Sequence, residues 1–216
     1  MKAAIFVAFC LLAIGALGTS TIATIPTIPT IVPAQEDNDF KERQPKKEHF
    51  YALAYLPSGA GMRMVGAGSS ANVDIRLNSY TSDAEARTMA KALTSEGPDA
   101  LLKLLENAKS RGKINITGRV GFYDFKLVRS HKIEGGRRIY AVGDRPVGFL
   151  EAYVSNRSRD YPFGILQLDL KRNSKGKEEG TGTLIYAAKI KVLGGKNIDV
   201  ETYGIEPIRM MGLKKW

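Results

Sequence analysis

The chain of 216 residues contains one cysteine, Cys10, and two histidines, His49 and His131. Cys10 lies within an N-terminal apolar run that is typical of a removable signal, so the mature chain would contain no cysteine. That excludes a thiolate nucleophile, a disulfide and an iron–sulfur cluster. A catalytic zinc site usually uses two or three histidines, and these two are far apart in sequence. We expect no metal site and no cofactor.

Nucleotide-binding and hydrolase motifs are also missing from the sequence. The chain has no P-loop and no G-x-S-x-G pattern. Residues 66–71, GAGSSA, match the dinucleotide pattern G-x-G-x-x-A, but the mechanism of that motif needs a helix directly after the glycines. Here the glycines lead into the alternating run 73–77, which predicts a strand. We interpret them as a turn or a bulge.

No apolar run is long enough to cross a membrane. The longest, 3–17, is shorter than the ~20 residues that a spanning helix needs, and it follows Lys2 and precedes small residues. This pattern predicts a signal peptide at 1–18, with cleavage as late as 34, and no span in the mature chain. We expect a secreted or periplasmic protein. The alternative is an uncleaved N-terminal anchor.

Residues 19–49 have the composition of an exposed linker. They repeat Thr-Ile-Pro at 24–26 and 27–29 and then turn to mixed charge from Glu36 to Glu48. Proline at a period of three favours an extended polyproline II spacer, and such a composition buries no core. The remainder, 50–216, is expected to form one β-rich domain.

Positive charge is concentrated in the middle of the chain. The formal net charge is +10, and residues 109–145 hold ten bases against three acids. This predicts a basic face that includes Lys113, Arg119, Arg137 and Arg138. Its partner would be an anionic polymer, such as a polysaccharide or nucleic acid, or an envelope component such as lipid head groups. The alternative is that the charge serves solubility alone.

Residues 82–111 predict a helical hairpin. Ser82 and Glu85 have the spacing of a capping box, and Ala86, Met89, Ala90 and Leu93 form one apolar stripe. Gly97-Pro98 ends one helix and begins the next. The second helix repeats the stripe at Leu101, Leu104, Leu105 and Ala108, and Gly112 closes it.

Most other segments alternate between apolar and polar residues. The runs are 73–77, 113–120, 125–127, 166–170, 183–192 and 198–201, with glycine-rich or asparagine-rich turns between several of them. Alternation with a period of two predicts half-buried antiparallel strands. We therefore expect an α+β domain that is predominantly antiparallel β, built as a curved sheet or a two-sheet sandwich, with the helical hairpin inserted.

Two loops are candidate binding sites. The first holds Asp144 and Arg145 before Pro146, and the second holds Arg157, Arg159, Asp160 and Tyr161. Arginine offers a planar fork for carboxylate or phosphate, and tyrosine offers a flat ring. The alternative is that each aspartate stabilises its own turn and each arginine pairs locally.

The segment between the two loops, 147–154, is expected to form a strand between 138–142 and 165–170. In such a meander the two loops lie at opposite ends of the middle strand and do not form one site. Glu151 on that strand is a possible buried acid that would need a cationic partner. A carboxyl in such a place has a raised pKa and could act as an acid catalyst.

The stretches GRRIYAVGDRPVGFLEA at 136–152, RSRDYPFG at 157–164 and ETYGIEPIRM at 201–210 resemble an uncharacterised family of exported bacterial proteins. The resemblance covers about 50–216. It implies export and a single domain, and it assigns no activity and no catalytic residues.

The sequence therefore favours a non-enzymatic binding or envelope-associated domain with a basic surface. One alternative is a carboxylate-dependent hydrolase outside the cytoplasm, using Glu151 or the pair Asp144 and Asp160. Another is a protein that binds polyanions.

Overall fold

A computed structural model describes residues 47–55, 70–118, 121–147, 160–193, 197–202 and 207–216. The expected signal peptide at 1–18 and nearly all of the expected linker lie outside these residues. The first strand begins at Glu48, so the last residues of the expected linker belong to the sheet.

The described residues form ten strands and two helices. The strands are β1 (Glu48–Tyr55), β2 (Ser70–Leu77), β3 (Gly112–Ile116), β4 (Tyr123–Phe125), β5 (Leu127–Ile133), β6 (Gly136–Gly143), β7 (Phe163–Arg172), β8 (Glu178–Leu193), β9 (Asn197–Thr202) and β10 (Ile208–Lys215). The helices are α1 (Asp83–Glu96) and α2 (Pro98–Asn107).

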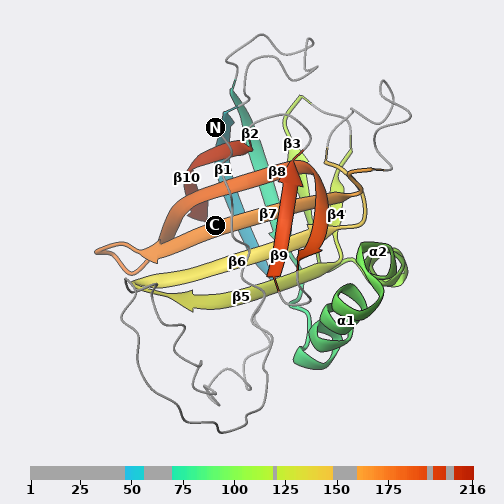
Figure 1. The fold of residues 1–216 in the computed structure, drawn as a ribbon. Helices are drawn as coiled ribbons and strands as arrows, with labels where there is room; N and C mark the ends of the chain where they lie inside the picture. Colours follow the sequence, from blue (N-terminus) through green and yellow to red (C-terminus); the bar gives the residue numbers. More distant parts are fainter. Residues whose placement is uncertain (1–46, 56–69, 119–120, 148–159, 194–196, 203–206) are drawn as a thin grey trace, which may run out of the picture.

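All ten strands belong to one antiparallel sheet that curves into a nearly closed barrel (Figure 1). The order is β4-β3-β2-β1-β10-β8-β7-β6-β5, with β9 also paired to β8. The outermost strands of this order, β4 and β5, are consecutive in the chain and are joined by Lys126. The Lys126 N–H donates to the carbonyl of Val142 in β6 at 2.9 Å, which holds the two edges together. The predicted β-rich class with two helices is confirmed.

The barrel interior is filled by the apolar half of each alternating strand. Phe50, Ile75, Ile114, Ile139 and Leu168 are all fully buried there. Successive strand residues point to opposite faces, so the period of two in the sequence becomes an inside and an outside. Removing these side chains from water is the main favourable contribution to the fold.

A second core lies on the outside of the barrel, over β5 to β8. Met89, Leu93, Leu101 and Leu105 of the two helices pack there with apolar residues of β5 to β9. The capping box begins α1 as expected, because Ser82 accepts from the Glu85 N–H and Glu85 accepts from the Ser82 N–H. Neither described helix is long and apolar enough to cross a membrane.

The outer face of β10, β1, β2 and β3 lies away from both helices (Figure 1). The outer core that contains Met89, Leu93, Leu101, Leu105 and Ile198 includes no described residue of these four strands. Within the described chain this is the flank of the barrel whose outward side chains meet solvent.

The expected meander through 147–154 is wrong. β6 pairs directly with β7 over eight positions, from Gly136 opposite Lys171 to Gly143 opposite Gly164, so no strand lies between them. Val147 is in a bend, and the rest of that segment lies outside the described residues. The alternation there resembles that of a strand, but pairing depends on contacts that the local pattern does not contain.

Candidate functional site: a groove on the exposed flank of the barrel

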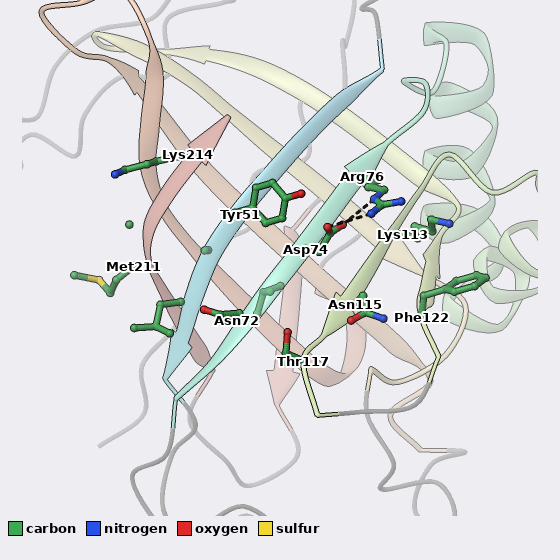
Figure 2. Close-up of a pocket in the computed structure, with 14 residues that line it drawn as sticks. Tyr51, Asn72, Asp74, Arg76, Lys113, Asn115, Thr117, Phe122, Met211 and Lys214 are labelled. Carbon is green, nitrogen blue, oxygen red and sulfur yellow. Dashed lines mark hydrogen bonds and ion pairs between the residues drawn. The ribbon is translucent and has the colours of Figure 1, made fainter. Parts of the chain in front are cut away.

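An open groove of about 790 Å³ lies on the outer face of β10, β1, β2 and β3. Figure 2 shows Tyr51, Asn72, Asp74, Asn115 and Thr117 along its floor. Met211 and Lys214 flank it on the β10 side, and Lys113 and Phe122 flank it on the opposite side.

Strand register arranges the groove residues in rows that cross the sheet. One row runs Lys214, Tyr51, Asp74, Asn115 from β10 to β3, and the next runs Met211, Leu53, Asn72 and ends beside Thr117. Directly opposite residues on one face have Cβ atoms about 4.5–5.5 Å apart. The side chains of one row can therefore contact the same bound molecule.

Strand β1 is unusual because both of its faces are largely apolar. Its inward set, Phe50, Ala52 and Ala54, is buried, while its outward set is His49, Tyr51, Leu53 and Tyr55. The side chains of Tyr51 and Tyr55 are 37% and 48% exposed. A half-buried strand ordinarily places polar residues on its solvent face.

Exposed aromatic side chains lie on both sides of the groove, and Tyr51 and Trp216 contact each other. The C-terminal Trp216 is 88% exposed, and its ring centroid lies 5.4 Å from that of Tyr51. The Trp216 N–H donates to the His49 carbonyl at 2.9 Å, which holds the C-terminus against β1. With Met211 and Phe122, about half exposed each, they form an exposed apolar and aromatic surface of the kind that marks binding sites.

Three cations border this surface without a carboxylate partner among the described residues: Lys113, Arg209 and Lys214. Lys113 Nζ lies 4.5 Å from the ring centroid of Phe122, a cation–π contact. Arg209 lies opposite Tyr55, and Lys214 lies opposite Tyr51. The groove therefore combines flat apolar rings with Lys and Arg side chains that form no ion pair with a described acid, although Asp124 lies opposite Lys113 in the strand register.

Among the described residues, Asp74 is the one acid on the groove floor. Its Oδ1 accepts from Arg76 Nε at 2.9 Å, and its Oδ2 lies 2.8 Å from His49 Nε2. Partial burial by itself would raise the pKa of Asp74, but the hydrogen bonds from Arg76 and His49 outweigh it and hold this pKa below its usual value. Asp74 is therefore ionised near neutral pH and is still a quarter exposed.

The structure brings the two predicted loops to the same end of the sheet. Asp144 and Arg145 follow Gly143, which pairs with Gly164 just after Asp160 and Tyr161. The expectation that the loops lie at opposite ends of a strand is wrong, because β6 pairs directly with β7 and no strand separates the loops.

Both loops find polar partners. Arg145 Nη2 lies 3.9 Å from Asp124 of β4, and Asp144 lies 3.8 Å from Lys126 Nζ. Tyr161 donates to Glu201 at 2.8 Å, and Asp160 is exposed.

The predicted basic face is divided between different environments. Lys113 lies on the outer face of β3 and borders the groove. Arg137 points into the end of the barrel, and Arg138 forms a two-point ion pair with Asp169. Arg119, Glu151, Arg157 and Arg159 lie outside the described residues.

A partly buried ion cluster lies at one end of the barrel. Arg137 of β6 donates to Glu48 at 2.7 Å and to Glu178 at 2.6 Å, and Lys215 donates to the same Glu48 oxygen at 2.6 Å. Tyr80 also donates to Glu48. Every charge in this cluster has an opposite charge beside it, so the cluster has no free group to offer a ligand.

The cluster shifts the pKa values of its two carboxyl groups in the direction that keeps them ionised. Burial would raise the pKa of Glu48, but hydrogen bonds from Arg137, Lys215 and Tyr80 outweigh it and lower this pKa. Burial has the same effect on Glu178, and Arg137 lowers its pKa. Burial and the charge of Glu48 raise the pKa of Tyr80. We interpret the cluster as a structural element.

Sequence reasoning missed both the groove and the ion cluster, although β1 contained a signal for each. Glu48 shares the parity of Phe50 and Ala52, which places a carboxylate on the buried face. Tyr51 and Tyr55 share the opposite parity, which places rings on the solvent face. No group of three or more His, Cys, Asp or Glu side chains that could hold a metal ion occurs in the part of the chain that the structure describes.

Comparisons of the chain with family models, with curated proteins and with solved structures gave no match.

Proposed function

We propose that this protein is a non-enzymatic binding domain that acts outside the cytoplasm and holds an anionic polymer in the groove. The observation that supports it is the placement of Lys113, Arg209 and Lys214 around exposed aromatic rings, without carboxylate partners among the described residues. Unneutralised cations attract polyanions and release the counterions of the polymer on binding.

The geometry favours binding over hydrolysis. Hydrolysis by carboxylates needs two functional groups that converge on one bound bond. The groove floor offers one carboxylate, Asp74, and both of its oxygens are engaged by Arg76 and His49. Asp144 lies beside Lys126, and Glu151 is outside the described residues. The hydrolase hypothesis stays a prediction.

Export is part of the proposal and is supported by the sequence of residues 1–18. Fractionation of cells that produce the full chain tests it. We expect the protein outside the cytoplasm and shortened at its N-terminus. A cytoplasmic chain that retains Met1 would contradict this part of the proposal.

Binding to immobilised heparin, eluted with a salt gradient, tests the binding function. We expect the wild-type chain to elute above physiological salt. The double variant Lys113→Ala/Lys214→Ala should elute earlier. The magnitude of the slope of log K against log salt should decrease by up to about 2, because each contact between a cation and an anionic group of the polymer contributes about one.

The matched control removes the same charge elsewhere. Lys91 and Lys103 are exposed on α1 and α2, away from the groove. Lys91→Ala/Lys103→Ala should elute close to the wild type. Equal effects of the two double variants would show that net charge alone causes retention, and elution of the wild type at low salt would refute the binding function.

A further inference from the structure

The floor of the groove has a different chemistry from its borders. Asn72, Asn115 and Thr117 supply amide and hydroxyl groups, and Asp74 lies between them. The cations stand at the two sides, Lys214 on β10 and Lys113 on β3. The polar floor and the cationic borders set separate requirements for the bound polymer.

Asp74 sets the first requirement. A carboxylate only accepts hydrogen bonds, and its two oxygens have about four acceptor sites. Arg76 and His49 use three of them in the structure. Asp74 lines the groove, so a ligand that uses the remaining acceptor must bring a donor to it. A phosphodiester backbone offers only acceptors and negative charge, whereas a sugar hydroxyl both donates and accepts.

The spacing of the cations sets the second requirement. Across the sheet, Lys214 on β10 and Lys113 on β3 are separated by three strand spacings, or about 14 Å. The row of Lys214 contains Tyr51 and Asp74 and ends at Asn115, and Lys113 lies two residues along β3 from that end. A nucleic acid carries a negative charge at every nucleotide, and one of those charges would fall over Asp74. A polysaccharide has hydroxyl groups between its acid groups, so it can place a hydroxyl over Asp74 in place of a charge.

The tyrosine sets the third requirement. Tyr51 is partly exposed and lies next to Asp74 in the same row. Trp216 lies against the Tyr51 ring edge to face. A pyranose ring has an apolar C–H face that can cover an aromatic ring and bury its apolar surface. Its hydroxyl groups point outward at the rim, where the Asn72 and Asn115 amides and the Thr117 hydroxyl are placed.

We propose that the groove binds an acidic polysaccharide whose chain crosses the sheet from β10 to β3. One sugar ring packs on Tyr51, its hydroxyls bond to Asp74 and the neighbouring amides, and acid groups on the same chain meet Lys214 and Lys113. This inference depends on the proposed function, and it narrows the anionic polymer to one chemical class. Single-stranded nucleic acid is the competing class.

The fluorescence of Trp216 provides the measurement, because it is the only tryptophan in the chain and lies beside the groove. The full chain is titrated with polygalacturonate, with an oligothymidylate that has the same number of charges, and with neutral dextran. We expect polygalacturonate to bind at least tenfold more tightly than oligothymidylate, and dextran to bind too weakly to measure.

Two variants separate the classes further. Asp74→Ala should weaken the binding of polygalacturonate about tenfold, the scale of one hydrogen bond to a charged group. It should strengthen the binding of oligothymidylate because it removes a repelling charge. Thr117→Val keeps the shape of the side chain and removes its hydroxyl. It should weaken the binding of polygalacturonate severalfold and leave the binding of oligothymidylate unchanged. This variant tests the inference even if Asp74→Ala perturbs folding.

The outcomes distinguish the two proposals. The polysaccharide inference would be overturned if oligothymidylate bound as tightly as polygalacturonate, or if Asp74→Ala strengthened the binding of both polymers. Either result would leave the anionic-polymer function standing. The proposed function itself would be overturned if neither acidic polymer bound. It would also be overturned if the double variant Lys113→Ala/Lys214→Ala bound them as tightly as the wild type.

Discussion

Arg137 of β6 and Glu48 of β1 meet inside the end of the barrel, with Arg137 Nη2 2.7 Å from Glu48 Oε1. The two residues are 89 positions apart in the chain, and the side chain of Glu48 is 5% exposed. Arg137 also binds Glu178, so one guanidinium compensates two carboxylates from different strands. The pair therefore connects strands that are not neighbours in the sheet order.

Replacing Arg137 is expected to be costly. Arg137→Met leaves Glu48 and Glu178 with Lys215 as their only cation in the cluster, and breaking a buried pair in this way costs about 3–5 kcal/mol of the free energy of unfolding. Urea denaturation measures this loss in the free energy of unfolding. The control is its neighbour, Arg138→Met, whose partner Asp169 is 30% exposed and which should cost about 1 kcal/mol or less. Similar losses from the two variants would contradict a buried role for Arg137.

Acid should weaken the barrel through the same cluster. The folded-state pKa of Glu48 is below the ordinary value of 4.5, so the unfolded chain takes up its proton first as pH falls. The stabilisation from Glu48 is then complete well above pH 4.5 and is lost as pH falls through the folded pKa.

Urea midpoints between pH 7 and pH 3 test this expectation. The wild type should lose stability below about pH 4.5. Glu48→Gln should be less stable at pH 7 and should lose less stability on acidification, since it has no carboxylate to protonate. Other carboxylates titrate in both proteins, so the difference between the two curves isolates Glu48. Parallel curves would refute the assignment.

Gly180 should not tolerate a side chain. A Cβ at Gly180 would lie 1.8 Å from the carbonyl oxygen of Asp169 in the neighbouring strand β7, so β7 and β8 would have to move apart. We expect Gly180→Ala to cost about 1–3 kcal/mol, the usual range for overpacking. Thr181→Ala, at the exposed next position, should change stability by only about 0.5 kcal/mol. Thermal denaturation of the two variants compares them, and equal shifts would count against the close contact.

Tyr51 should contribute to binding without releasing counterions. Tyr51→Ala is expected to weaken heparin binding by about 1 kcal/mol or more if the ring packs on the ligand, while the slope of log K against log salt stays at the wild-type value. Lys214→Ala should instead lower that slope by about 1. Titrations at several salt concentrations distinguish the two effects. A changed slope in Tyr51→Ala would mean that the ring acts by placing a cation.

Local patterns predicted the local structure well. The spacing of Ser82 and Glu85 predicted the start of α1, because capping is a contact between residues three positions apart. Glycine-rich turns were expected between strands, and Gly135 has a positive φ in the turn between β5 and β6.

Non-local pairing could not be predicted in the same way. The segment 147–154 alternates as a strand does, yet β6 pairs directly with β7. Register depends on which strands meet and on their turns. The sequence also placed Arg137 and Arg138 on one basic face, although adjacent strand residues point to opposite sides. Arg137 turns inward to Glu48, and Arg138 pairs with Asp169.

The sequence by itself determined which residues alternate, where α1 begins, and that the chain is rich in antiparallel strands, because these properties depend on neighbours in the chain. Only the tertiary structure decided that the sheet curves into a nearly closed barrel and that the helices cover one flank of it. That choice places Tyr51, Asp74 and Lys214 side by side on the other flank. Their proximity depends on strand register between distant segments, which no local pattern contains.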